Sequence, residues 1–400
     1  MYNSRKKTFA FKLISLIMIA FIAVITCDNQ PIYLYIGYIT MMGITILNMA
    51  FNKKINKIKI RAPMLLLVVF GCFCALSGAW AWDPALVQSN QVVILAGVSM
   101  IVIMGNYFIE ENSPEIILLT ILLSGLVLSF YVVISYGGLS AFYDIASKGE
   151  DRLGSEIKNV NSIGMSCAYS SVILCYYAIY KKQRLCWIIM ILPTIVLLST
   201  ASRKAILMLL LGCFLLVILR PGQERGYGKY LKIIIGLIIL ICIVYAVLQL
   251  PLLSNVSERL EMAFSTLTGD VRHADGSSIT RKRMIEVGLE QFTKTPFIGI
   301  GLNNSSILNF NQLRFAAYSH NDYVDLLVNG GAIGFGLYYG TIFILLRRHI
   351  VKIKHNIDDV CKISFVLMIM LLFANMAAVT YYGGLTTYVL ILLWVVVAYA

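Results

Sequence analysis

The residue with the clearest chemical potential is a histidine that precedes a long apolar segment. His320 is followed by Asn321 and Asp322, both of which are residue types that begin helices. Imidazole titrates near neutral pH, so His320 is a candidate general base toward a substrate hydroxyl. An ordinary polar residue at a helix start is the alternative interpretation. No second histidine or cysteine lies at ligand spacing from His320, and we therefore expect no metal site.

A second candidate is the arginine of a very short connection between two apolar runs. Arg203 and Lys204 separate the runs 185–201 and 205–219 with almost no loop. The guanidinium group must therefore lie close to the membrane surface if both runs are membrane helices. It can act as an interfacial anchor. It can also bind a lipid phosphate, because its planar fork of donors suits phosphate oxygens and keeps its charge when partly desolvated.

A third candidate is the basic start of an amphipathic segment. After Arg281, Lys282 and Arg283, apolar residues recur at helical spacing and predict a helix of about three turns that stops before Pro296. Three N-cap residue types precede it: Ser277, Ser278 and Thr280. Basic residues in a first turn oppose the helix dipole, which indicates a negatively charged partner. A glycine-punctuated turn, PFIGIGLNN, follows.

A weaker polar lead-in precedes the apolar run that begins near residue 161. It contains Arg152, Asn159 and Asn161. Capping of the following helix is the default interpretation.

The elements that must position these residues are membrane helices. The 400 residues are 59% hydrophobic and 13% charged, whereas soluble domains have about 25% charged residues. Apolar runs long enough to cross a bilayer recur along the chain and predict an all-α bundle of about twelve transmembrane helices in one domain, 1–400. The predicted helices span residues 9–27, 31–51, 62–82, 91–109, 115–136, 161–180, 185–201, 203–220, 231–250, 322–346, 361–381 and 384–400.

The distribution of Lys and Arg predicts how this bundle is oriented. With the N-terminus inside, basic residues concentrate in the inside loops, including one that contains Arg347, Arg348, Lys352, Lys354 and Lys362. Residues 251–321 then form a long extracytoplasmic loop. The four candidate residues, Arg152, Arg203, Arg281 and His320, all lie on the extracytoplasmic side. The net charge of +13 is thus mostly a topology signal rather than a nucleic-acid surface. The nine cysteines contain no CxxC pair and are expected to be buried hydrophobic residues.

Taken together, these segments resemble the bacterial O-antigen ligase and Wzy-type polysaccharide polymerase superfamily. The resemblance rests on three blocks in order. These are Ser202-Arg203 between membrane helices, Arg281 with an amphipathic helix and Pro-x-x-Gly-x-Gly, and His320-Asn321 before a glycine-rich helix. The glycines of that helix, Gly330, Gly331 and Gly334, are expected to let it pack closely against a neighbouring helix. The Arg152 lead-in is similar to a further family feature. Arg283 remains the alternative to Arg281.

The resemblance implies a glycosyltransferase of the bacterial cytoplasmic membrane that needs no cofactor and no metal. Its donor would be an undecaprenyl-pyrophosphate-linked glycan. Arg203, Arg281 and Arg152 would bind the pyrophosphate, and His320 would be the catalytic base. We expect a Wzy-type polymerase, with an O-antigen ligase that uses lipid A core as the close alternative. Membrane lipids, a flippase and a chain-length regulator are the implied partners. A transporter of lipid-linked sugars is the alternative from another class. It predicts charged residues inside the membrane helices, for which Asp325 is the main candidate.

Overall fold

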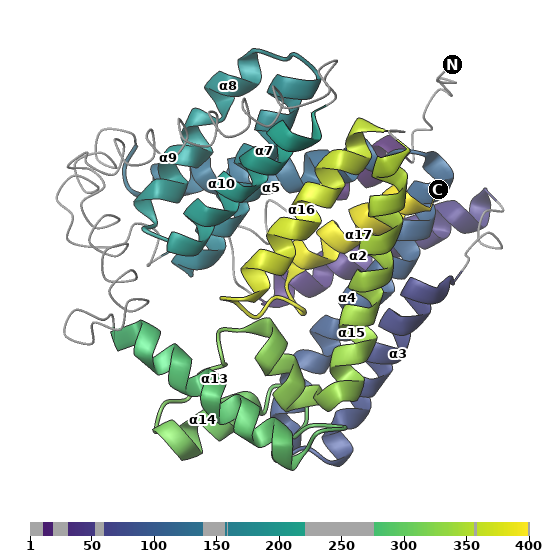
Figure 1. Ribbon diagram of the computed structural model, residues 1–400. Coiled ribbons are helices and arrows are strands. Elements are labelled where there is room, and N and C mark those ends of the chain that lie inside the picture. The colour runs from purple at the N-terminus through teal and green to yellow at the C-terminus, as the bar shows by residue number, and fades with distance from the viewer. Residues whose placement is uncertain are drawn as a thin grey trace. The chain divides into compact units, whose positions relative to one another are not determined.

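The computed structural model describes residues 11–18, 31–52, 60–138, 157, 159–220, 276–355 and 358–398 (Figure 1). Every regular element in these ranges is a helix, which confirms the all-α prediction for them. The predicted helix 231–250 lies outside the described residues, as do residues 251–275 of the predicted loop.

Five helices are long and apolar enough to cross a membrane. They are α3 (Ala62–Leu76) with its 3-10 extension to Ala79, α4 (Pro84–Glu111), α5 (Pro114–Ser135), α7 (Val160–Tyr180) and α15 (Asp322–Lys354). Large apolar side chains such as Ile39 and Ile134 are exposed, as suits contact with hydrocarbon. The chain is therefore an integral membrane protein of helical spans, while the count of twelve stays a prediction.

The predicted helix 185–201 is two helices. α8 (Leu185–Ile189) ends four residues before Pro193, and α9 (Ile191–Ser199) follows. Proline lacks the N–H that would bond to the carbonyl four residues earlier, and its ring crowds that carbonyl. Pro193 therefore cannot bond to the carbonyl of Ile189, and the helix is broken at Met190, the next residue.

The last basic stretch of α15 is helical, so the predicted inside loop after residue 346 is wrong in part. α15 continues to Lys354 and includes Arg347 and Arg348. Within it His349 is fully buried, bonding to the carbonyl of Leu345 at 2.9 Å and to the Ser364 hydroxyl at 3.0 Å. Lysine and arginine are good helix formers and are favoured near helix C-termini, which is why the helix extends beyond its apolar run.

The described chain divides into two compact units. The first comprises residues within 1–120, 283–365 and 375–400, and the second those within 121–282 and 366–374. In the first unit, α15 packs along α3, and α4 lies between α3 and α17 (Gly384–Val397), with α2 (Pro31–Phe51) against α4. Gly330 and Gly334 face the Phe73 ring, so these two glycines let α15 approach α3 closely, as predicted. In the second unit, α7 packs against α9 and α10 (Arg203–Leu219).

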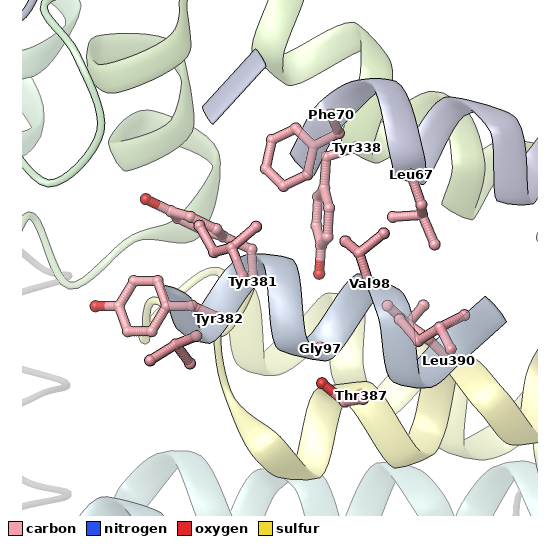
Figure 2. A pocket seen from close by; sticks show the side chains of 12 residues that line it. Leu67, Phe70, Gly97, Val98, Tyr338, Tyr381, Tyr382, Thr387 and Leu390 are labelled. Atoms are coloured by element: carbon pink, nitrogen blue, oxygen red, sulfur yellow. The ribbon is translucent and has the colours of Figure 1, made fainter. Parts of the chain in front are cut away.

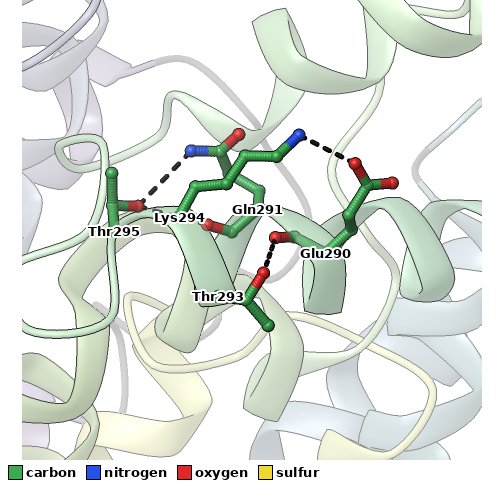
Figure 3. Close-up of polar contacts among 5 residues, drawn as sticks. All are labelled: Glu290, Gln291, Thr293, Lys294 and Thr295. Atoms are coloured by element: carbon green, nitrogen blue, oxygen red, sulfur yellow. Dashed lines mark hydrogen bonds and ion pairs between the residues drawn. The ribbon is translucent and has the colours of Figure 1, made fainter.

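The predicted amphipathic helix is α13 (Gly276–Lys294), which is longer than expected at 19 residues. It begins before Ser277 and Thr280, so these residues lie inside the helix, and Arg281 lies in the second turn rather than the first. The end is as predicted. Lys294 donates to Glu290 at 2.7 Å, and Thr293 and Gln291 make further local bonds there (Figure 3). The bond and charge of Lys294 lower the pKa of Glu290.

Two further helices complete the described chain. α14 (Ser305–Leu313), which the sequence did not suggest, lies between α13 and α15, and α16 (Asp359–Asn375) precedes α17. A small apolar cluster of Ile300, Leu308, Val324 and Val328 joins α14 to α15, with Ile285 and Val287 of α13 packed against it. This cluster positions α13 beside the first turns of α15.

Candidate functional site

The first turns of α15 are joined to the glycine-punctuated segment by an interruption of the helix. Gly331 has φ 61° and ψ −165°, a conformation that is essentially restricted to glycine. The helical hydrogen bonds at this point are replaced. Ala332 and Ile333 N–H groups donate to the carbonyls of Pro296 and Phe297, at 2.7 and 3.1 Å.

Hydrogen bonds between residues 296–301 and α15 run in both directions. The N–H groups of Ile300 and Gly301 donate, each at 3.0 Å, to the carbonyls of Val328 and Asn329. A Cβ atom on Gly331 would collide with the Phe297 backbone, and one on Gly299 with the Asn329 backbone. The Pro-x-x-Gly-x-Gly block and the glycines of α15 are therefore two halves of one structural feature, which fixes the C-terminal end of α13 against α15.

Asp322, the first residue of α15, is fully buried and does not cap the helix as the sequence suggested. The cap is Asn321, whose side chain accepts from Val324 N–H at 3.1 Å. Asp322 instead accepts bonds from the Tyr339 hydroxyl at 2.7 Å and from the N–H groups of Thr380 and Tyr381. It therefore anchors the connection between α16 and α17 to the start of α15.

Asp325, one turn further on, is the centre of a second buried network. Its carboxylate accepts from the Ser305 hydroxyl at 2.6 Å, the Asn329 amide at 2.8 Å and the Tyr381 hydroxyl at 3.2 Å. The Ser319 hydroxyl lies 3.5 Å away. Burial raises the pKa of the Tyr381 phenol well above its ordinary value, so this side chain stays a donor. Asp325 thereby joins α14, α15 and two connections.

His320 lies between two residues that these networks hold in place. Its own backbone is left-handed, with φ 55°, and its partly exposed ring lies 4.3 Å from the Tyr318 ring, centroid to centroid. On one side Ser319 is buried against Asp325, and on the other Asn321 caps the helix and donates to the Met376 carbonyl at 3.2 Å. The position of the His320 backbone is thus set by buried groups, not by a free loop.

Replacing Asp325 by Ala is expected to destabilise the protein by about 3 kcal/mol or more. The reason is that three buried donors, on Ser305, Asn329 and Tyr381, lose their acceptor. The measurement is the unfolding midpoint of the purified protein in detergent. Glu286→Ala, which removes an exposed carboxylate from α13, is the control and should shift it little. Equal midpoints for the two variants would contradict the assigned network.

A small cavity adjoins the Asp325 network at Tyr381, which is one of its lining residues. Figure 2 shows the side chains that line it, which come from α3, α4, α15, α17 and the segment before α17 and include Tyr338 and Tyr381. Its volume of about 20 Å³ suffices for one water molecule and is far too small for a sugar. The cavity is therefore a small packing defect between these helices and not a substrate pocket.

In the second unit the structure brings two of the predicted polar segments together. Ser202 is the N-cap residue of α10, and its hydroxyl donates to the Asn161 side chain at 3.0 Å. Asn159 caps α7 by accepting from Asn161 N–H, also at 3.0 Å. Arg203 is then the first residue of α10, after a turn in which Ala201 has φ 47°. The very short connection is as predicted.

The faces of α13 distinguish its two candidate arginines. The buried residues Met284, Gly288 and Gln291 recur at helical spacing, and Arg281 continues that face one turn earlier. Arg283 is exposed and shares the opposite face with Glu286 and Glu290. Arg281 is therefore on the face of α13 that carries its buried residues, and Arg283 is on the exposed face.

The predicted site residues are not all placed together. His320 belongs to the first compact unit, whereas Arg203 and Arg281 belong to the second, and each is described within its own unit. Arg152 lies outside the described residues. Among the described residues, no three His, Cys, Asp or Glu side chains gather as a group that could hold a metal ion.

Comparison with protein families supports the resemblance. Residues 188–339 match the family model described as O-Antigen ligase (Wzy_C). The match includes Arg203, Arg281 and His320, and it ends within α15 beyond the Gly331 interruption. No curated protein matches the chain. The chain is therefore a helical membrane protein in which residues 188–339 are similar to the O-antigen ligase family.

Proposed function

We propose that the protein is a membrane glycosyltransferase that polymerises undecaprenyl-pyrophosphate-linked oligosaccharide repeat units into a cell-surface polysaccharide. The single observation that carries the proposal is the coupling of the matched blocks around His320. The Gly331 interruption and the cluster of Val324 and Val328 fix the first-unit part of α13, from Arg283 to Lys294, and the segment after it against α15, the helix that begins after His320. Such a linkage holds the backbone around His320 in one arrangement, as a catalytic base requires.

The reaction is a single displacement. His320 takes the proton of an acceptor hydroxyl, and the oxygen attacks the anomeric carbon of the donor while the bond to the lipid pyrophosphate breaks. Attack from the face opposite the leaving group inverts the anomeric configuration. Arg203 and Arg281 stabilise the negative charge that develops on the pyrophosphate, as fixed donors do most effectively in a partly desolvated site. Pyrophosphate is a good leaving group, so these residues suffice without a metal ion.

Replacing Arg203 by Lys is expected to slow transfer about 100-fold, because a single ammonium group replaces the planar fork of donors. Arg281→Lys should have a similar effect and Arg283→Lys a much smaller one. The measurement is the initial rate of glycan elongation by purified protein. Arg184→Lys, an exposed substitution in the same unit as Arg203, is the matched control. Equal rates for Arg203→Lys and Arg184→Lys would remove Arg203 from the mechanism.

An O-antigen ligase is the second candidate, and the description of the matched family favours it. The two activities share the donor and differ in the acceptor. Incubation of the protein with lipid-linked glycan and either lipid-linked repeat units or lipid A core distinguishes them. Product only with lipid A core would establish the ligase and replace the polymerase proposal.

The transporter alternative requires charged groups in the middle of the membrane. Several ionisable side chains are buried within helices, which the sequence suggested only for Asp325. However, Asp322 and Asp325 lie in the first turn of α15, and His349 and Lys352 lie near its other end. Between Asp325 and Arg347, this helix contains no ionisable residue other than tyrosine. The distribution of charge in α15 thus favours an enzyme whose polar site lies at a membrane surface.

A further inference from the structure

The other end of α15 carries a groove that the transfer reaction does not use. Its volume is about 510 Å³, and it lies between the start of α3 and the ends of α15 and α17. Arg347 follows His320 by 27 residues, a path of about 40 Å along a helix that exceeds the roughly 30 Å hydrocarbon core. The lining residues include three arginines and an apolar wall: Arg61, Arg347, Arg348, Phe343, Ile344 and Val351.

Two of the arginines are held in place by protein groups. Arg61 donates to the carbonyl of Ala398 at 3.4 Å, and the Arg348 guanidinium carbon lies 6.0 Å from the Trp394 ring centroid. Lys352, which is buried, donates to the Val396 carbonyl at 2.7 Å. Arg61 and Lys352 thus bond to the carbonyls of Ala398 and Val396 at the end of α17, so these two carbonyls do not occupy the donors of Arg347 or Arg348.

Arg347 is exposed and makes no hydrogen bond or ion pair within the described part of the chain. None of the side chains that line the groove is acidic. The groove thus offers several donors for an anion. No carboxylate among the described lining residues competes for them. Arginine binds phosphate oxygens through paired donors more effectively than it binds a spherical anion.

The apolar wall indicates where the anion comes from. Phe343, Arg347 and Val351 lie four residues apart on one face of α15, and Phe343 and Val351 are 66% and 50% exposed. An arginine between two exposed apolar side chains near the end of a membrane helix holds its charge at the bilayer surface, at the level of the lipid headgroup phosphates. A phospholipid provides both the phosphate and an acyl chain for the apolar stripe, whereas free phosphate provides only the anion.

We propose that this groove binds the phosphodiester of an anionic phospholipid, such as phosphatidylglycerol, with an acyl chain along Phe343 and Val351. Under the charge-based topology the lipid belongs to the cytoplasmic leaflet, opposite the transfer site. The inference is independent of the proposed transfer reaction. It gives the basic end of α15 a role in lipid binding in addition to its effect on the orientation of the protein in the membrane.

The test is native mass spectrometry of the detergent-purified full-length protein titrated with phosphatidylglycerol. Wild type should retain the lipid, and Arg347→Gln combined with Arg348→Gln should weaken binding about tenfold or more. Lys354→Gln, which removes one exposed charge from the same helix end outside the groove, is the matched control and should bind as wild type does. Arg347→Gln alone serves if the double variant does not fold, because Arg347 contacts no described partner.

Two further arms separate the sources of the anion. Phosphatidylcholine should bind at least about tenfold more weakly, since its net charge is zero, and inorganic phosphate should not displace phosphatidylglycerol. Equal retention by wild type and the arginine variants would overturn the proposal. Displacement by inorganic phosphate, or equal binding of both lipids, would overturn it as well.

Discussion

Replacing His320 by Asn is expected to leave a folded, membrane-inserted protein that no longer extends glycan chains. General base catalysis contributes about 10²- to 10⁴-fold, and an amide cannot supply it. Asparagine is the right substitution because His320 has φ 55°, and asparagine adopts the left-handed conformation at little cost. The measurement is the length distribution of surface polysaccharide on cells that produce the variant at normal abundance, which should show only single repeat units.

The control for this prediction is His355→Asn. His355 is exposed and lies just after the end of α15, far along the helix from His320. It should leave chain length unchanged. Long polymer at normal levels with His320→Asn would show that His320 is a structural residue at a helix start and not the base.

Replacing Gly331 by Ala is expected to destabilise the protein by about 3 kcal/mol or more and to abolish transfer. The Gly331 conformation is essentially restricted to glycine, and the added methyl group would collide with the Phe297 backbone. Relief requires that residues 296–301 leave α15, which breaks four backbone hydrogen bonds and releases the end of α13. The measurements are the unfolding midpoint in detergent and the rate of glycan elongation.

Gly336→Ala provides a matched control on the same helix. Gly336 is exposed, and an added methyl group there would meet no atom within 4 Å. The substitution should stabilise the helix slightly, by up to about 1 kcal/mol. If the two variants had the same midpoint and the same activity, the interruption at Gly331 would have no role in positioning the site.

The sequence predicted the helical class and the positions of most described helices, because apolar runs and basic flanks are local signals. It also predicted the end of α13 and the short turn before Arg203. It did not predict α14, the length of α15 beyond residue 346 or the start of α13 at Gly276. In α13 and α15 polar helical residues extend past the apolar positions, and α14 is a short helix with many polar residues, so hydropathy gives no boundary in any of the three.

The buried networks around His320 were only partly visible in the sequence. Asp322, Asp325 and Asn329 recur at spacings of three and four residues, which places them on one face of a helix. That pattern was a signal of a buried polar face, and capping was the wrong interpretation for Asp322. The partners could not be foreseen, because Tyr339 and Tyr381 lie 17 and 59 residues from Asp322 along the chain.

The Gly331 interruption shows how two separate motifs can share one cause. In the sequence, the glycines of residues 299–301 predicted a turn, and those of residues 330–334 predicted close helix packing. Both interpretations are correct for part of each set. The additional role arises only in three dimensions, where the backbone of one segment replaces the helical hydrogen bonds of the other.

The most direct test of the central claim is an elongation assay with purified protein and a synthetic undecaprenyl-pyrophosphate-linked repeat unit as both donor and acceptor. Wild type is predicted to form oligomers whose new glycosidic bonds have the anomeric configuration inverted relative to the donor, and to do so equally well in the presence of a chelator. His320→Asn is predicted to form none. Failure of wild type to form any new glycosidic bond, or equal product from wild type and His320→Asn, would contradict the account.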